Sequence, residues 1–146
     1  MGKTTILRDC IRNISNGIIK YNFNGINVGV VDERGEIAAM YKGIPQNDLG
    51  ERTDVLDNVS KDVGMKMLVR SMSPKVIAVD EIGTKEDVDA INYVVTSGVK
   101  GIFTAHGASL GDITLNPILS SLYNLGVIEK IILIQENRHT KLIYSK

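Results

Sequence analysis

The sequence has little of several residue types, and each shortage excludes a class of protein. Tryptophan is absent and aromatic residues make up 5 % of the chain, so a platform for stacking nucleic-acid bases is not expected. Basic and acidic residues number 17 each, which leaves no positive excess to attract nucleic acid. The single cysteine, Cys10, has no partner for a disulfide within the chain, as suits a reducing cytoplasm. Apolar runs such as 131–134 are far shorter than the roughly 20 residues that span a bilayer.

What remains is a chain of 146 residues, 43 % apolar and 23 % charged, which is enough for one domain over 1–146 with a sizeable core. Predicted helices cover 4–16, 61–72, 85–97 and 109–124, the last split or kinked at Pro117. Predicted strands cover 26–31, 76–79 and 101–105, with a C-terminal hairpin of 130–135 and 141–144. Alternating strands and helices predict an α/β fold with a mostly parallel sheet flanked by helices. The stretch 32–60 is either functional or contains short elements.

The first motif is Gly2-Lys3-Thr4-Thr5, immediately before a predicted helix. It matches the end of the Walker A, or P-loop, pattern G-x-x-x-x-G-K-[ST]. Backbone N–H groups at the helix start bind phosphate, Lys3 reaches the terminal phosphates of ATP, and the Thr4 hydroxyl ligates Mg²⁺. A solvated helix start is the ordinary alternative for so short a match. Because the chain begins inside the loop, we expect the strand that feeds the loop to be missing from it.

A second motif strengthens the first. The apolar strand 76–79 ends in Asp80 and Glu81, which is a Walker B pattern. In this pattern Asp80 belongs to the Mg²⁺ site and Glu81 polarises the attacking water. A strand that ends in a solvated acidic loop is the alternative. The combination with Gly2–Thr5 favours an ATPase that uses ATP and Mg²⁺.

Two further strands end in candidate groups. Asp32 and Glu33 follow one strand, and either is a candidate base or Mg²⁺-supporting group; a salt-bridged strand exit explains them equally well. His106 follows another strand, on the side where parallel sheets bind ligands, and is a candidate to contact the γ-phosphate. His139, in the predicted hairpin, is expected on the surface.

Two arginines are candidates for an arginine finger, acting within the chain or on a neighbouring subunit. Arg70 precedes the strand 76–79, and Arg52 lies in the stretch 32–60. A surface ion pair is the more common role for a single arginine, so the sequence leaves this choice open.

Taken together, the motifs resemble the stage III sporulation protein AA family of endospore-forming bacteria. The resemblance runs from Gly2 to about Glu136 and rests on GKTTILRD, VGVVDERGEIA, YKGIPQNDLGERTDVLD, GMKMLVRSMSPKVIAVDEIGTKED and GIFTAHGASL. The block that ends in Asp80-Glu81-Ile82-Gly83 also resembles the type II/IV secretion and pilus-retraction ATPases. In that superfamily Asp32-Glu33 would fill the aspartate box and His106 the histidine box.

The resemblance implies a RecA-like P-loop ATPase that forms a homo-oligomeric ring, a hexamer, with nucleotide at subunit interfaces. It implies a motor in the mother-cell cytoplasm, peripheral to the membrane, whose partners are the membrane-embedded channel proteins of the sporulation complex; no nucleic acid is expected. The family has an N-terminal domain and a complete loop before Gly-Lys-Thr, and this chain departs from that pattern. The alternative is therefore an inactive fragment or a non-catalytic nucleotide-binding or assembly module.

Overall fold

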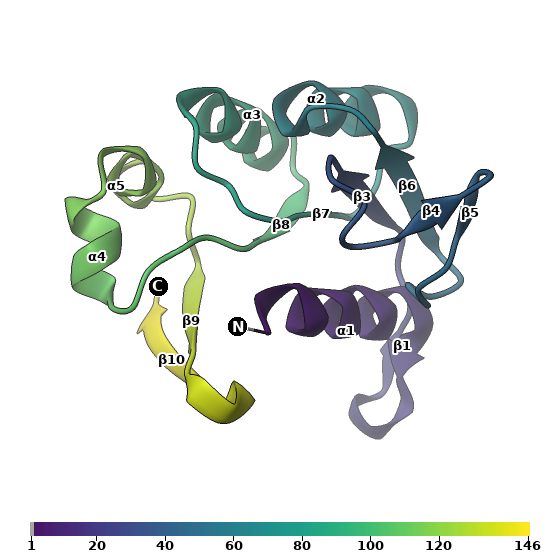
Figure 1. Cartoon of the computed structure of the whole chain (residues 1–146), viewed down its shortest axis with the longest axis horizontal. Helices are drawn as coiled ribbons and strands as arrows, with labels where there is room; N and C mark the ends of the chain where they lie inside the picture. The colour runs from purple at the N-terminus through teal and green to yellow at the C-terminus, as the bar shows by residue number, and fades with distance from the viewer. Residues whose placement is uncertain (1) are drawn as a thin grey trace.

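The computed structural model describes residues 2–146, and a parallel sheet lies between helices on its two faces (Figure 1). The sheet has four strands in the order β6-β3-β7-β8, with all neighbours parallel. Its strands are β3 (Val28–Asp32), β6 (Thr53–Asp57), β7 (Val76–Val79) and β8 (Lys100–Phe103). Helix α1 (Lys3–Asn16) covers one face, and α2 (Lys61–Ser71) and α3 (Lys85–Thr96) cover the other.

Strand β7 shows why the sheet carries helices on both faces. All four of its residues are buried. Val76 and Ala78 pack in the cluster that contains Leu7 of α1, whereas Ile77 and Val79 pack in the cluster formed with α2 and α3. A strand that is buried on both faces has a continuous apolar sequence, which is why Val-Ile-Ala-Val is recognisable without alternation.

The rest of the chain forms smaller elements around this core. Helices α4 (Leu110–Leu115) and α5 (Pro117–Asn124) follow β8, and the antiparallel pair β9 (Lys130–Ile134) and β10 (Thr140–Ser145) forms a separate two-stranded sheet. A 3-10 turn, η2 (Glu136–Arg138), joins β9 to β10. Two short hairpins, β1 (Gly17–Ile18) with β2 (Phe23–Asn24) around η1 (Ile19–Tyr21), and β4 (Met40–Tyr41) with β5 (Ile44–Pro45), complete the fold.

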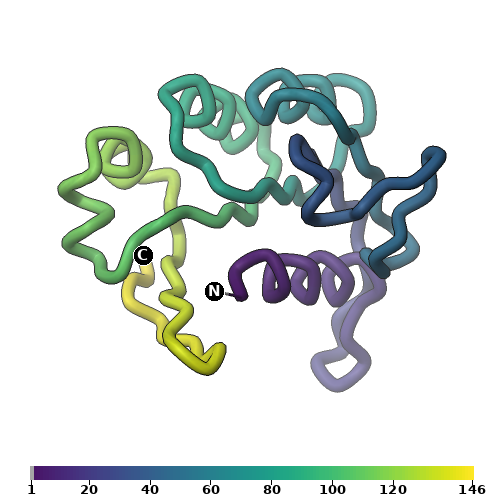
Figure 2. Tube along the Cα trace, viewed as in Figure 1, coloured from purple at the N-terminus to yellow at the C-terminus, as the bar shows by residue number. Residues whose placement is uncertain are grey.

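In the view of Figure 2, the start of α1 and the end of the chain lie close together near the middle of the molecule. The first turn of α1 and the turn η2 line one pocket, so residues more than a hundred positions apart face each other. Among residues 2–146, no helix combines the length and the apolar character that crossing a membrane requires.

The predicted fold class is confirmed, including the parallel sheet, the flanking helices, the division at Pro117 and the C-terminal hairpin. Strand β6 was not among the predicted strands; the stretch 32–60 was expected either to be functional or to contain short elements. Its sequence, Thr-Asp-Val-Leu-Asp, contains two apolar residues because it is an edge strand whose Asp54 and Asp57 are exposed. Such a strand lacks the apolar run that identifies β7.

Candidate functional site

Three predicted residues meet at the carboxyl edge of the sheet. The Nζ atom of Lys3, at the start of α1, lies 3.0 Å from Nδ1 of His106 and donates a hydrogen bond to the Ala105 carbonyl at 3.3 Å. Nε2 of His106 lies 3.7 Å from Oε1 of Glu81. Lys3, His106 and Glu81 thus form one chain of contacts, because parallel strands end at a common edge.

The start of α1 is suited to an anion. Gly2 precedes the helix with a φ of 103°, a conformation in which glycine avoids the strain of a side chain. No side chain of the described residues caps the helix, and its first turn contains no acidic residue. The N–H groups of a helix start carry partial positive charge, so this end is a ready site for phosphate.

Glu81 is held from several directions. Its backbone has a φ of 48°, which is unfavourable for a residue with a side chain. Its N–H donates to Oγ1 of Thr104 at 2.8 Å, and its carbonyl accepts from Nζ of Lys61 at 2.7 Å. Arg34 donates from Nη1 to Oε2 of the carboxylate at 2.9 Å. Such strain persists where the surroundings fix it, and it is common at functional sites.

Asp80 precedes Glu81 and is 3 % exposed. Burial raises the pKa of its carboxyl group, and the carboxylates of Asp32 and Glu36 raise it further, whereas Lys61 acts in the opposite direction. A buried carboxylate beside other negative charges favours a cation. The hydroxyl of Thr4 and the carboxylate of Asp80 are the hard oxygen donors that Mg²⁺ prefers, so the residues fit this metal.

Residues 2–146 contain no group of three or more His, Cys, Asp or Glu side chains that would hold a metal without help. Magnesium in nucleotide sites is bound through one or two protein ligands together with phosphates and water. Asp80 and Thr4 would therefore supply only part of a Mg²⁺ shell, and a bound nucleotide and water would supply the rest.

The two acidic residues after β3, Asp32 and Glu33, have different surroundings. Asp32 is fully buried, and its carboxylate accepts hydrogen bonds from the N–H groups of Ile37 at 3.2 Å and Ala38 at 2.8 Å. It therefore fixes the turn after β3. Glu33 is exposed and lies 3.8 Å from Nζ of Lys61, the lysine that also binds Glu81. Glu33 thus borders the site, and its role as a second base stays a prediction.

The remaining predicted phosphate-binding residues line a pocket. Gly2, Thr4 and Thr5 line a pocket of about 770 Å³ whose other wall is formed by residues 134–138 of the C-terminal hairpin. This volume is within the range of about 300–1,000 Å³ that is usual for small-molecule sites. The pocket is continuous with the anion-suited helix start.

The two arginine-finger candidates are not brought to this site within the chain. Arg52 lies before β6, at the amino edge of the sheet, and its Nη1 donates to the Ser15 carbonyl at 3.1 Å. Arg70 is exposed in the last turn of α2, the end opposite Lys61. Action on a neighbouring subunit stays a prediction for both. His139 is exposed, as expected.

Three residues that hold Glu81 were given no role by the sequence patterns: Arg34, Lys61 and Thr104. The one indication in the sequence that Arg34 belongs to the site is its position directly after the acidic pair Asp32-Glu33. Lys61 and Thr104 lie 20 and 23 positions from Glu81, and no local spacing indicates that they meet it.

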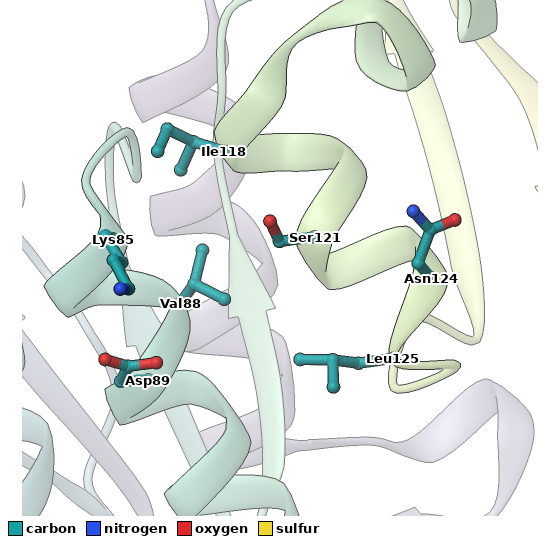
Figure 3. Close-up of a pocket in the computed structure, with 7 residues that line it drawn as sticks. All are labelled: Lys85, Val88, Asp89, Ile118, Ser121, Asn124 and Leu125. Carbon is teal, nitrogen blue, oxygen red and sulfur yellow. The ribbon is translucent and has the colours of Figure 1, made fainter.

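A second pocket lies between α3 and α5, away from this cluster (Figure 3). Its volume is about 300 Å³, and polar Lys85, Asp89 and Asn124 border it together with apolar Val88 and Leu125. None of the predicted site residues lines it.

Comparison with known proteins identifies the family. The family described as Sporulation stage III, protein AA matches residues 1–145. Stage III sporulation protein AA of Bacillus subtilis (strain 168) is 48 % identical over 122 residues, which cover 84 % of this chain and 39 % of that protein. Protein SEEDLING PLASTID DEVELOPMENT 1 of Arabidopsis thaliana is 32 % identical over 136 residues, covering 91 % of this chain and 18 % of that protein. The chain therefore spans about two-fifths or less of the length of these relatives.

Solved structures show the same fold. The VirB11 ATPase from the Brucella suis type IV secretion system, in complex with sulphate, has a TM-score of 0.62 at 16 % identity and covers 99 % of this chain and 45 % of its own. The Legionella pneumophila ATPase DotB has a TM-score of 0.60 at 15 % identity, and the match covers 97 % of this chain and 41 % of the DotB chain. The fold is that of these ATPases, and the resemblance predicted from the motifs is confirmed. The chain belongs to the sporulation stage III protein AA family.

Proposed function

We propose that this chain binds ATP with Mg²⁺ at the start of α1 and hydrolyses it at Glu81. One observation supports the proposal: His106 contacts both Lys3 and Glu81 at the carboxyl edge of the sheet, and Glu81 directly follows the buried Asp80. A lysine that binds the terminal phosphates and a group that orients the attacking nucleophile are recurring parts of sites that transfer phosphoryl groups. The fold shared with the VirB11 and DotB ATPases supports the same reading.

Each residue has a definite task in this proposal. Lys3 and the N–H groups of the first turn of α1 bind the β- and γ-phosphates. Thr4 and Asp80 would hold Mg²⁺, which when bound neutralises charge on the phosphate oxygens. Glu81 orients the attacking water and accepts its proton. Its carboxylate is suitably placed for this task because it contacts His106, which in turn contacts Lys3.

Phosphate binding would also change the contacts of His106. Nζ of Lys3 now contacts the Ala105 carbonyl and Nδ1 of His106. A γ-phosphate that recruits the ammonium group removes it from both partners. His106, which is 79 % exposed, then becomes free to contact the phosphate itself. In this way the contacts of the segment after β8 differ between the states with and without the terminal phosphate.

The biological role that we propose is a motor. Family membership and the secretion ATPase that shares the fold support a homo-oligomeric ring, a hexamer, at the mother-cell side of a membrane during endospore formation. Its partners would be membrane-embedded channel proteins of the sporulation complex. Arg52 or Arg70, both exposed, would then be available to act across a subunit interface.

The test is phosphate release from Mg-ATP by the unaltered chain and by Glu81→Gln. We expect the variant to bind ATP within about threefold of the unaltered chain and to lose on the order of 10² to 10⁴ in turnover, the contribution of a general base. Glu51→Gln, an exposed carboxylate at the amino edge, is the matched control. ATP binding without turnover by the unaltered chain would instead support a non-catalytic nucleotide-binding module.

A further inference from the structure

The first turn of α1 faces two different surroundings. Lys3 points to one side, toward Ala105 and His106 after β8. Gly2, Thr4 and Thr5 line the pocket that the C-terminal hairpin borders. A nucleotide whose terminal phosphates lie at Lys3 therefore extends its α-phosphate and nucleoside toward this pocket.

The far wall of the pocket is the turn of the C-terminal hairpin. Residues 134–138 line it, and four of them, Gln135 to Arg138, have polar side chains. Arg138 is nearest to the helix start: its Cγ atom lies 3.5 Å from the position that a Cβ atom would occupy on Gly2. No carboxylate of residues 2–146 forms an ion pair with Arg138.

We propose that this turn holds the nucleoside end of the bound nucleotide, with Arg138 on the α-phosphate. The inference rests on the proposed function. A guanidinium group offers five donors in a fork that matches two phosphate oxygens, which a lysine does not. The carboxylate of Glu136 repels further phosphate groups but accepts hydrogen bonds from ribose hydroxyls. The turn therefore offers a donor for the α-phosphate and an acceptor for the sugar hydroxyls.

The test compares ADP with ATP, each titrated with Mg²⁺ into the unaltered chain and Arg138→Ala by calorimetry. Both nucleotides carry an α-phosphate, so the variant is expected to bind both about tenfold more weakly, by the same factor. Arg138→Lys is expected to recover part of the loss. The matched control is Lys141→Ala on β10, which also removes one positive charge from an exposed position and should leave the affinities for ADP and ATP unchanged.

Other results would overturn the inference. Weaker binding of ATP with unchanged binding of ADP would assign Arg138 to the γ-phosphate. Unchanged affinity for both nucleotides would remove Arg138 from the site, while a loss of binding in Lys3→Ala would leave the proposed function standing. An unaltered chain that binds neither nucleotide would contradict the proposed function and this inference together.

Discussion

Helices α1 and α3 both begin at the carboxyl edge of the sheet, on opposite faces, and their first turns are built in opposite ways. Thr84 accepts a hydrogen bond from the Asp87 N–H at 3.1 Å, and the Asp87 carboxylate accepts from Gly83 and Thr84 in return. Two acidic residues, Glu86 and Asp87, stand in that first turn. Helix α3 therefore satisfies its own N–H groups and its own dipole.

Helix α1 does neither of these things. Gly2 provides no side chain for capping, and no acidic residue follows it in the first turn. The difference shows that the N–H groups of a helix start are either capped by the protein's own side chains or left available to an anion. The helix that is capped by its own side chains is closed to an anion, and the helix left uncapped is the one beside Lys3, His106 and Glu81.

The largest expected effect comes from giving α1 the acidic first turn of α3. In Thr5→Glu, the new carboxylate competes with phosphate, and juxtaposed like charges cost several kcal/mol, so ATP affinity should fall on the order of 100-fold. The same charge interacts favourably with the helix dipole and should not lower the thermal stability. Calorimetry and thermal unfolding measure the two effects. Thr114→Glu, on exposed α4, is the control; equal ATP affinity in both variants would contradict the comparison.

Removing the N-cap of α3 should lower the stability of the protein and leave its ATP affinity unchanged. Thr84→Ala deletes the hydroxyl that accepts from Asp87, and loss of an N-cap typically costs about 1 kcal/mol of the free energy of unfolding. Chemical denaturation measures this loss, and ATP affinity should not change. A variant of unchanged stability, or one that loses ATP binding, would show that the two helix starts do not have separate tasks.

A smaller effect is expected from the arginine that holds Glu81. Arg34 is 61 % exposed, so its ion pair is worth at most about 1 kcal/mol, equivalent to about fivefold. Arg34→Ala should lower kcat by up to about that factor and leave KM unchanged, because it orients the carboxylate rather than the nucleotide. Arg12→Ala, which removes an exposed pair with Asp9, is the control. A rise in KM at constant kcat would instead make Arg34 a ligand of the nucleotide.

The last effect depends on pH. The pKa of Asp80 is raised above the ordinary 3.8 by burial and by nearby carboxylates, so the folded state disfavours the charged form. At a pH above the raised pKa, the charged carboxylate lowers the free energy of unfolding by its full amount. This destabilisation disappears as the pH falls toward 3.8, where the carboxyl group becomes protonated. Asp80→Asn should therefore unfold at a higher temperature than the unaltered chain at pH 7, and the difference should shrink at acid pH. A variant that is less stable at pH 7 would contradict this account.

The sequence was sufficient for the parts of the site that depend on local pattern. Lys3, Glu81 and His106 each follow a recognisable motif at the end of an element, and the parallel topology requires those ends to meet. The apolar strand 76–79 was visible because it is buried on both faces.

The missed features depend on contacts between distant residues. Lys61 and Thr104 bind the backbone of Glu81 from α2 and from the end of β8, and neither stands in a pattern that indicates this. Asp32 was a candidate base or Mg²⁺-supporting group, with a salt-bridged strand exit as the equal alternative. Its hydrogen bonds from the N–H groups of Ile37 and Ala38 are an arrangement that only the folded turn creates. The pairing of the hairpin turn with the start of α1 is equally a product of tertiary structure.

The central claim is that the uncapped start of α1 is the phosphate site. A calorimetric titration of the chain with Mg-ATP, beside Lys3→Ala and the exposed control Lys66→Ala, tests it most directly. The account predicts saturable binding that Lys3→Ala abolishes and Lys66→Ala preserves. A folded chain that binds no ATP, or a Lys3→Ala variant that binds as tightly as the unaltered chain, would contradict it.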